Sequence, residues 1–405
     1  MYRFFSLKKG KNMTNNLLNT LPLPLKLAGK FIAHNESAAG LSTSRFIQDT
    51  TTQLIPKATF SRSKAELFEN TFLETAESAV VYFLPQILGE KIFRKLFSKK
   101  LNLEQKKLIA KNFEKLKNNP NKNKVIPIKA AIAITSLIIP ILVFTLNYFK
   151  NLLTIKAFKQ SDFVNIASLE KKEEDNNKIN KVKNSAYKNL TRALIAAIVS
   201  VLGAVFLAKK GSKSKKLRDI CEFILSPGDK LAKNNKKLKE FVNKYFCIDY
   251  TSENGKLNLS KGQLTSCVLI GGLGYFGAAY DRGKENFMET LFRYPIVGLY
   301  VISGSELFEN GFKRILKKSG RCKETLKDDL KVVKFSELNK LANKLADKNN
   351  TDIKNEYKKL VKQKSLITLI PFIFSIGVMG FFVCAMTNIS TKLRYKKEKA
   401  KQLVA

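Results

Sequence analysis

The stretch AAIAITSLIIPILVFTLNYF, residues Ala130 to Phe149, carries no charged side chain over 20 consecutive positions. An α-helix rises about 1.5 Å per residue, so roughly 20 apolar residues cross the hydrocarbon core of a bilayer. Further charge-free stretches lie at Ala193–Ala208, Gly262–Tyr280 and Ser365–Thr391. Together the four stretches predict an all-α integral membrane protein, a polytopic helical bundle with long basic amphipathic loop helices.

The rest of the chain offers little apolar surface with which to bury four such helices in water. Outside the four stretches the sequence is dense in Lys and Asn and has few apolar runs. Core helices of soluble proteins that are apolar on every side are also usually shorter. The composition therefore favours hydrocarbon, and not protein, as the surroundings of the four helices.

The counts of individual residue types exclude several kinds of site. The 405-residue chain has 73 Lys and Arg against 33 Asp and Glu, a net charge of +40, one His, five Cys and no Trp. His34 alone cannot build a metal site of several histidines or a His-rich proton relay. No two cysteines lie at the spacing of a zinc ribbon or a thioredoxin-like centre. The sequence thus indicates no catalytic, cofactor-binding or metal-ligating residue, and it leans against an enzyme.

Composition shifts divide the chain into four regions. Residues 1–65 form a basic N-terminal arm, and residues 66–149 hold a short apolar segment, a basic helix and the first long span. Residues 150–280 hold the second and third spans with basic loops. Residues 281–405 hold a second short segment, a basic helical loop, the last span and a basic tail.

Basic amphipathic segments lie between the apolar stretches. Apolar residues recur at helical spacing within residues 92–116, 217–245 and 326–345, and the positions between them are rich in Lys. Helices of this type either lie in the lipid headgroup layer or form a solvated helical domain, and the pattern allows both. The first functional prediction is a multi-pass membrane protein that binds anionic lipid headgroups, or an acidic partner, through these Lys-rich helices.

The same Lys runs argue against nucleic acid as the partner. Nucleic-acid recognition relies on Arg forks and exposed aromatic side chains, whereas Lys accounts for 62 of the 73 basic residues. Each run borders an apolar segment, so lipid headgroups are the nearer anion. Residues 1–40 lack the Ser and Arg content of an organelle transit peptide, so we expect the inner membrane of a bacterial cell rather than an organelle membrane.

Two pairs of similar sequences indicate an internal repeat. ELFENTF at residues 66–72 is similar to ELFENGF at 306–312, and ENTFLET at 69–75 is similar to ENFMET at 285–290. The pairs have different offsets and cannot both be in register. Two amphipathic helix starts of similar composition are therefore the alternative explanation.

Each repeat copy is associated with a short apolar segment. Ser78–Leu88 contains Pro85, and Tyr294–Ser303 contains Pro295. A helix of about ten residues spans only half the bilayer core, so each segment must be re-entrant, interfacial or shielded by other helices. Short Pro-interrupted segments at matching places in two halves of a membrane protein point to the substrate site of a transporter.

Four carboxylates precede these segments, at Glu74, Glu77, Glu285 and Glu289. An ionisable side chain at membrane depth is expensive and marks an ion or substrate pathway. The sequence therefore predicts a cation or proton site at these four residues. The alternative functional prediction is a secondary transporter or channel.

A glycine-rich motif lies in the third apolar stretch. Gly272, Gly274 and Gly277 spell G-x-G-x-x-G after a short apolar run, which is similar to the dinucleotide-binding fingerprint. That fingerprint belongs in a series of alternating strands and helices, and none surrounds it here. Small residues in an apolar helix instead allow close helix contact. We therefore predict a homo-oligomer contact at Gly271, Gly274 and Ala278, and a membrane-bound dehydrogenase is the third and least favoured function.

Overall fold

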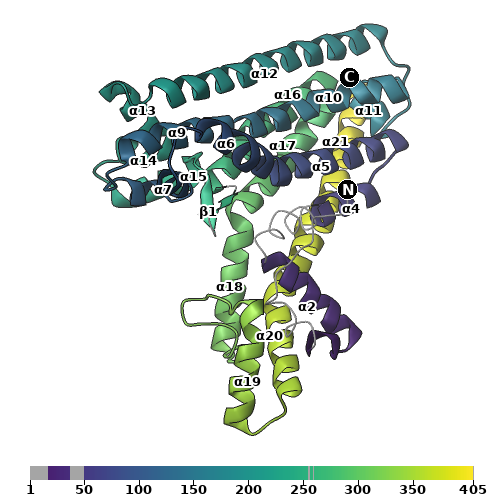
Figure 1. The fold of residues 1–405 in the computed structure, drawn as a ribbon. Coiled ribbons are helices and arrows are strands. Elements are labelled where there is room, and N and C mark those ends of the chain that lie inside the picture. The colour runs from purple at the N-terminus through teal and green to yellow at the C-terminus, as the bar shows by residue number, and fades with distance from the viewer. Residues whose placement is uncertain (1–16, 37–49, 254–255, 259, 405) are drawn as a thin grey trace, which may run out of the picture. The chain divides into compact units, whose positions relative to one another are not determined.

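The computed structural model describes residues 17–36, 50–253, 256–258 and 260–404. The chain divides into two compact units. Unit 1 comprises residues 1–48 and 303–378, and unit 2 comprises residues 49–302 and 379–405. Figure 1 shows that helices make up nearly all of the regular structure, which confirms the all-α part of the sequence prediction.

Unit 1 is a small helical domain. Its elements are α2 (Leu23–Glu36), α18 (Ser305–Lys318), the 3₁₀ helix η4 (Phe335–Glu337), α19 (Leu338–Asn349) and α20 (Ile353–Phe374). Ile32 of α2 packs with Phe335, Leu338 and Leu360 in its main buried cluster. The N-terminal region of the sequence thus contributes a helix to a core otherwise formed by residues near the C-terminus.

Unit 2 contains most of the helices. Its α-helices are α4 (Ile55–Thr59), α5 (Lys64–Pro85), α6 (Arg94–Phe97), α7 (Leu103–Ile109), α8 (Phe113–Leu116), α9 (Lys122–Thr135), α10 (Ile138–Phe158), α11 (Phe163–Ile166), α12 (Asn176–Lys210), α13 (Lys215–Leu225), α14 (Gly228–Leu231), α15 (Lys236–Phe246), α16 (Lys261–Arg282), α17 (Lys284–Leu299) and α21 (Val383–Val404). Strands β1 (Thr251–Glu253) and β2 (Lys256–Asn258) pair antiparallel, with Ser252 opposite Leu257. This hairpin is the one sheet among the described residues.

Four π-helical segments accompany these α-helices in the described part of the chain. They are η1 (Thr50–Leu54), η2 (Gln86–Phe93), η3 (Tyr300–Gly304) and η5 (Ser375–Phe382). Pro85, Pro295 and Pro371 lie inside the α-helices that lead into the last three. Proline removes a backbone donor and disturbs the regular hydrogen-bond ladder, and in these three helices a wider π turn follows the proline.

Helices α9 and α10 form the centre of unit 2. They contain the charge-free stretch that opens with Ala130, and 72% of their most apolar window is buried. Helices α5, α12 and α16 pack around α10. Ile132, Ile139 and Val143 are buried completely or almost completely. Each such side chain contributes about 1.5–3 kcal/mol on burial from water, so this stretch stabilises the centre of unit 2.

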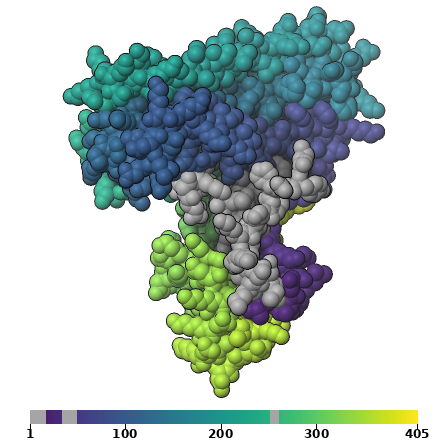
Figure 2. Space-filling model, in the orientation of Figure 1, coloured from purple at the N-terminus to yellow at the C-terminus, as the bar shows by residue number. Residues whose placement is uncertain are grey.

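Three helices in the described part of the chain are long and apolar enough to cross a membrane. They are Lys122–Phe158, Asn176–Lys210 and Ile353–Val404, and each contains one of the stretches identified in the sequence. In contrast to the central helix, α12 has only 17% of its apolar window buried. Figure 1 shows α12 along one margin of unit 2, and Figure 2 shows its surface uncovered in this view.

The third stretch, Gly262–Tyr280, differs from the sequence prediction of a membrane span. It forms helix α16, as expected, but it is not among the three candidate spans. Five glycines together with Gln, Thr and Ser lower its mean hydropathy below that of the other stretches. Its small residues bring it close to α10 inside unit 2, where Gly274 lies against the backbone of Phe144.

The two short apolar segments are not separate elements. Ser78–Leu88 occupies the end of α5 and the start of η2, and Tyr294–Ser303 occupies the end of α17 and most of η3. In both cases an acidic helix runs through a proline into a π-helical segment that contains a glycine. The similarity of ENTFLET at 69–75 to ENFMET at 285–290 thus extends to the local structure. ELFENGF at 306–312 lies in α18, after its π-helical segment, whereas ELFENTF at 66–72 lies before the other one.

One cluster of ion pairs ties α14 to its neighbours in unit 2. Asp229 accepts a hydrogen bond from Lys117, and its other oxygen lies 2.8 Å from Nζ of Lys239 in α15. Burial by itself would raise the pKa of Asp229, but the two lysines outweigh it and lower the pKa to about 2. The unfolded value is about 4, so the pairs stabilise the fold above pH ~4, and this contribution disappears as the pH falls from about 4 to about 2.

Replacing Asp229 by Asn is therefore expected to lower the free energy of unfolding at neutral pH by about 1 kcal/mol, the upper range for a partly exposed pair. The difference between variant and wild type should shrink as the pH falls below about 4, because the wild-type carboxylate is then protonated too. Urea denaturation of the purified protein, followed by circular dichroism across this pH range, measures the difference. A difference that does not change with pH contradicts the assignment.

Candidate functional site

Helix α5 presents a row of carboxylates on one side. Glu66, Glu69, Glu74 and Glu77 lie at spacings of three, five and three residues, which keeps them on one face over about 16 Å of helix. Ser63 caps the helix by accepting a hydrogen bond from the Glu66 backbone N–H. Glu66, Glu69 and Glu74 are buried. A row of acids on the buried face of a helix requires positively charged or hydrogen-bonding partners on the elements packed against it.

A cavity of about 170 Å³ lies against this face of α5. Helices α10, α16 and α17 of unit 2 supply much of its remaining wall. Its volume has room for about ten water molecules or a small solute. The charged side chains in its wall are Glu66, Glu69, Glu74, Glu77, Glu289, Lys57, Lys150 and Arg293.

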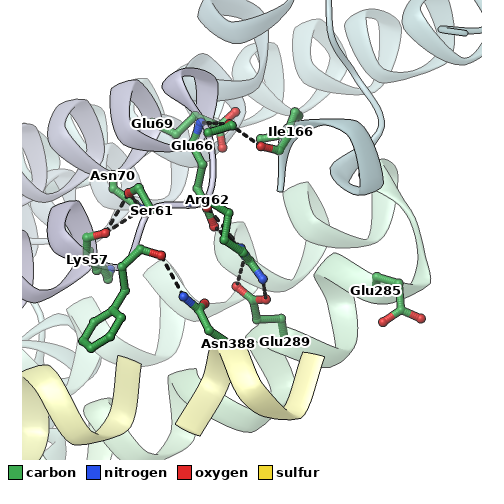
Figure 3. A network of polar contacts seen from close by, with 12 residues as sticks. Lys57, Ser61, Arg62, Glu66, Glu69, Asn70, Ile166, Glu285, Glu289 and Asn388 are labelled. Atoms are coloured by element: carbon green, nitrogen blue, oxygen red, sulfur yellow. Dashed lines mark hydrogen bonds and ion pairs between the residues drawn. The ribbon is translucent and has the colours of Figure 1, made fainter. Parts of the chain in front are cut away.

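Arg62 joins α5 to α17 beside the cavity. Its guanidinium pairs with Glu66 one turn along α5 and with both carboxylate oxygens of Glu289, at 3.1 and 3.2 Å. Figure 3 shows the Arg62 side chain between these two acids. The guanidinium also lies 5.3 Å from the centre of the Phe163 ring. Arginine suits this position because its planar fork can bind two carboxylates at once.

Glu69 has the most complete set of partners. It accepts two hydrogen bonds from Arg282 at the end of α16, one of them at 2.8 Å, and one from the Thr154 hydroxyl at 2.5 Å. Nζ of Lys150 lies 3.6 Å from the same carboxylate. Arg282 is 1% exposed, so the pair is removed from solvent. Through these contacts Glu69 connects α5 to α10 and α16 at one end of the cavity.

The remaining acids on α5 have partners of different kinds. Glu74 forms an ion pair with Lys57 of α4, and both side chains are nearly buried. Glu77 accepts a hydrogen bond of 2.5 Å from the hydroxyl of Tyr275 in α16. Arg293 of α17 also lines the cavity, and its Nη2 is buried without a hydrogen-bond partner. One donor in the cavity wall is therefore available to a bound group.

Three of the four carboxylates singled out in the sequence meet in this cavity. Glu74, Glu77 and Glu289 line it, although Glu289 is more than 200 positions from the other two. Glu285 does not line it. Glu285 is buried one helical turn from Glu289, points away from Arg62 in Figure 3, and pairs with Arg394 of α21 at 3.0 Å.

The cations that complete the site were not predicted from the sequence. Lys150 directly follows the first charge-free stretch, and Arg282 lies two residues after the end of the third. A basic residue at the end of an apolar helix has two uses, because it can reach toward solvent or pair with a buried acid. The sequence does not distinguish them, whereas the structure assigns both residues to Glu69.

The glycine motif lies within α16 and not at a turn between a strand and a helix. Gly272, Gly274 and Gly277 are all internal to the helix, so the dinucleotide-binding geometry is absent from this segment. Gly271 and Gly274 lie against Val143 and Phe144 of α10, and Ala278 is buried. The close helix contact predicted for this face thus occurs within one chain, while association between copies stays a prediction.

The side chains in the cavity wall can bind charged groups and can exchange their ion-pair partners. Among the described residues, no group of three or more His, Cys, Asp or Glu side chains is arranged to hold a metal ion. The cavity combines carboxylates, two lysines, an arginine and three tyrosine rings, Tyr82, Tyr275 and Tyr294. Comparison of the chain with family models, curated proteins and solved structures gives no match.

Proposed function

We propose that the chain is a polytopic membrane protein, located in the cell membrane of a bacterium, that binds a small charged solute or cation in the α5 cavity and moves it across the bilayer. This is the activity of a secondary transporter or channel. The cavity has the volume for such a ligand, and its wall has the charges to bind one.

The exposed face of α12 supports insertion in a bilayer. Large apolar side chains are exposed along more than three turns of this helix, at Leu194, Ile195, Ile198, Val199, Leu202 and Phe206. Soluble monomers rarely leave a contiguous apolar patch of this kind in water. Hydrocarbon would cover the face without any partner chain, and α9 and α10 would then be shielded from lipid by their neighbours.

The convergence of Glu74, Glu77 and Glu289 on one cavity carries the proposal. These carboxylates lie on α5 and α17, directly before the two Pro-interrupted segments, and such segments in two halves of a membrane protein point to a transport site. In this proposal a cationic solute displaces the Lys57 ammonium from Glu74, and the free Arg293 donor binds an anionic group of the solute. Buried ion pairs that can exchange one partner for a ligand suit reversible binding better than an apolar wall.

The test is flux through liposomes that contain the full-length protein. The panel should include protons, Na⁺, K⁺, amino acids and small organic acids. Glu74→Gln and Glu289→Gln are each expected to reduce the flux of the transported species at least about tenfold, equivalent to about 1.4 kcal/mol in the barrier. The folded fraction of each variant is measured in parallel, and Lys57→Met combined with Glu74→Gln removes both charges of a pair should Glu74→Gln alone unfold.

Glu285→Gln is the matched control. It makes the same chemical change one helical turn from Glu289, but at a carboxylate that does not line the cavity. Its flux should stay close to that of the wild type. Equal losses in Glu285→Gln and Glu289→Gln, or no flux of any panel member through the wild type, contradict the proposal.

A further inference from the structure

The segment that follows α12 is a packed helical structure and not a loose loop. Nζ of Lys230 in α14 donates a hydrogen bond of 2.8 Å to the Asp219 carbonyl in α13. The Gly228 N–H donates one of 2.7 Å to Asn243 of α15. Leu225 at the end of α13 is buried in a cluster with α9. Helices α13, α14 and α15 therefore present a defined surface, here called the basic helical surface.

This surface combines exposed apolar groups with a large excess of positive charge. Its exposed large apolar side chains are Ile220, Phe223, Leu231, Leu238, Phe241 and Phe246. Between positions 209 and 244 the sequence has twelve Lys and Arg and four Asp and Glu. Phe241 is 52% exposed and lies between Lys239 and Lys244 in the sequence. Apolar groups flanked by lysines are the pattern of helices that lie in a lipid headgroup layer.

The short connection between α12 and α13 indicates that a lipid bilayer covers the basic helical surface. The exposed apolar face of α12 ends near Phe206, and Lys209 and Lys210 follow at once. Only four residues separate the end of α12 from the start of α13, so the two ends lie at most about 18 Å apart. If α12 crosses a membrane, its Lys209 end lies at the interface, and α13 must begin within reach of the same headgroups.

We infer that the basic helical surface docks on the anionic headgroup layer of the membrane that α12 crosses, with Phe241 and its apolar neighbours inserted below the phosphates and the lysines bound to them. This inference rests on the membrane insertion proposed above and is independent of transport. It selects one site for the headgroup binding expected from the sequence. Anionic lipids bind there because phosphates neutralise the lysines while the acyl boundary covers the phenylalanines.

The absence of Trp from the chain provides a fluorescence test. Phe241→Trp and, separately, Leu194→Trp introduce a single indole into the full-length protein, which is reconstituted into phosphatidylcholine vesicles with or without phosphatidylglycerol. The acyl chains carry bromine at a shallow or a deep position. We expect quenching at position 194 in both lipids, because this position lies on the exposed apolar face of α12. At position 241 we expect shallow quenching that is at least about twofold stronger with phosphatidylglycerol.

A charge variant tests the role of the lysines. Changing Lys233, Lys236 and Lys237 together to Gln should abolish the dependence of quenching at position 241 on phosphatidylglycerol. The control changes three lysines of α19 in unit 1 to Gln, namely Lys340, Lys344 and Lys348. It alters the net charge equally and should leave the quenching unchanged. The same loss in both variants would show a non-specific charge effect and overturn the inference.

The quenching results at positions 194 and 241 distinguish the docking inference from the proposed membrane insertion. Quenching at position 194 without quenching at position 241 overturns the docking inference and leaves membrane insertion intact. Absence of quenching at both positions overturns both. If polyglutamate, and not the vesicle, protects position 241 from aqueous iodide, the surface binds an acidic polypeptide and the lipid assignment is wrong.

Discussion

Replacing Arg282 by Met is expected to lower the free energy of unfolding by about 3–5 kcal/mol, the largest effect of any single substitution considered. The guanidinium is 1% exposed and makes two hydrogen bonds to Glu69. Its removal leaves a buried carboxylate with a more distant cation, Lys150 at 3.6 Å, and the Thr154 hydroxyl. Denaturation of the detergent-solubilised protein, followed by circular dichroism, measures the change.

A surface ion pair two residues away provides the control. Lys284 pairs with Glu398 at 2.8 Å, but the lysine side chain is 68% exposed. Lys284→Met is expected to change the stability by less than about 1 kcal/mol, because solvent screens such a pair. The double variant Arg282→Met with Glu69→Gln should recover part of the loss, since it removes the unpaired buried charge. Similar effects of Arg282→Met and Lys284→Met would show that Glu69 does not depend on Arg282.

The second large effect is expected at Gly274, where the two helix backbones of α10 and α16 meet. A Cβ at this position would lie 2.6 Å from the Phe144 carbonyl oxygen and 2.8 Å from its Cα. Backbone atoms of a central helix cannot move aside cheaply, so Gly274→Ala should lower the free energy of unfolding by about 1–3 kcal/mol. The same denaturation assay measures it.

Gly203 of α12 is the matched control for this substitution. A Cβ there meets no atom within 4 Å. Gly203→Ala is expected to raise the free energy of unfolding by about 0.5–1 kcal/mol, because alanine is the better helix former. The two Gly→Ala changes should therefore have opposite signs. A stabilising Gly274→Ala would contradict the close contact between α10 and α16.

The apolar helices show how far a pattern of apolar residues predicts structure. All four charge-free stretches lie in helices, because a run of apolar residues with few helix breakers favours that structure wherever it is buried. The pattern did not distinguish their surroundings. The window of α9 and α10 is mostly buried inside unit 2, that of α12 is mostly uncovered, and α16 is too rich in glycine to be a candidate span. The burial of a helix depends on which of its faces neighbouring helices cover, and the sequence of the helix alone does not contain this information.

The site shows the same division between local and long-range information. The pattern of acids before Pro-interrupted segments identified Glu74, Glu77 and Glu289, but it also included Glu285, which pairs with Arg394 outside the cavity. Two residues one turn apart on α17 thus have different partners. The pairing of Arg62 with Glu289 joins positions 227 residues apart, and no periodicity in the sequence records such a pair.

The amino-acid sequence by itself determined the helical class, the positions of the apolar helices, the excess of positive charge and the two acidic segments that contain Pro85 and Pro295. These properties follow from spacing and composition along a short stretch of chain. Only the tertiary structure decided that Glu69 binds Arg282 and that three carboxylates share one cavity. The partner of a buried charge depends on how helices distant in the sequence pack, because 33 acids and 73 bases allow many pairings and only burial selects among them.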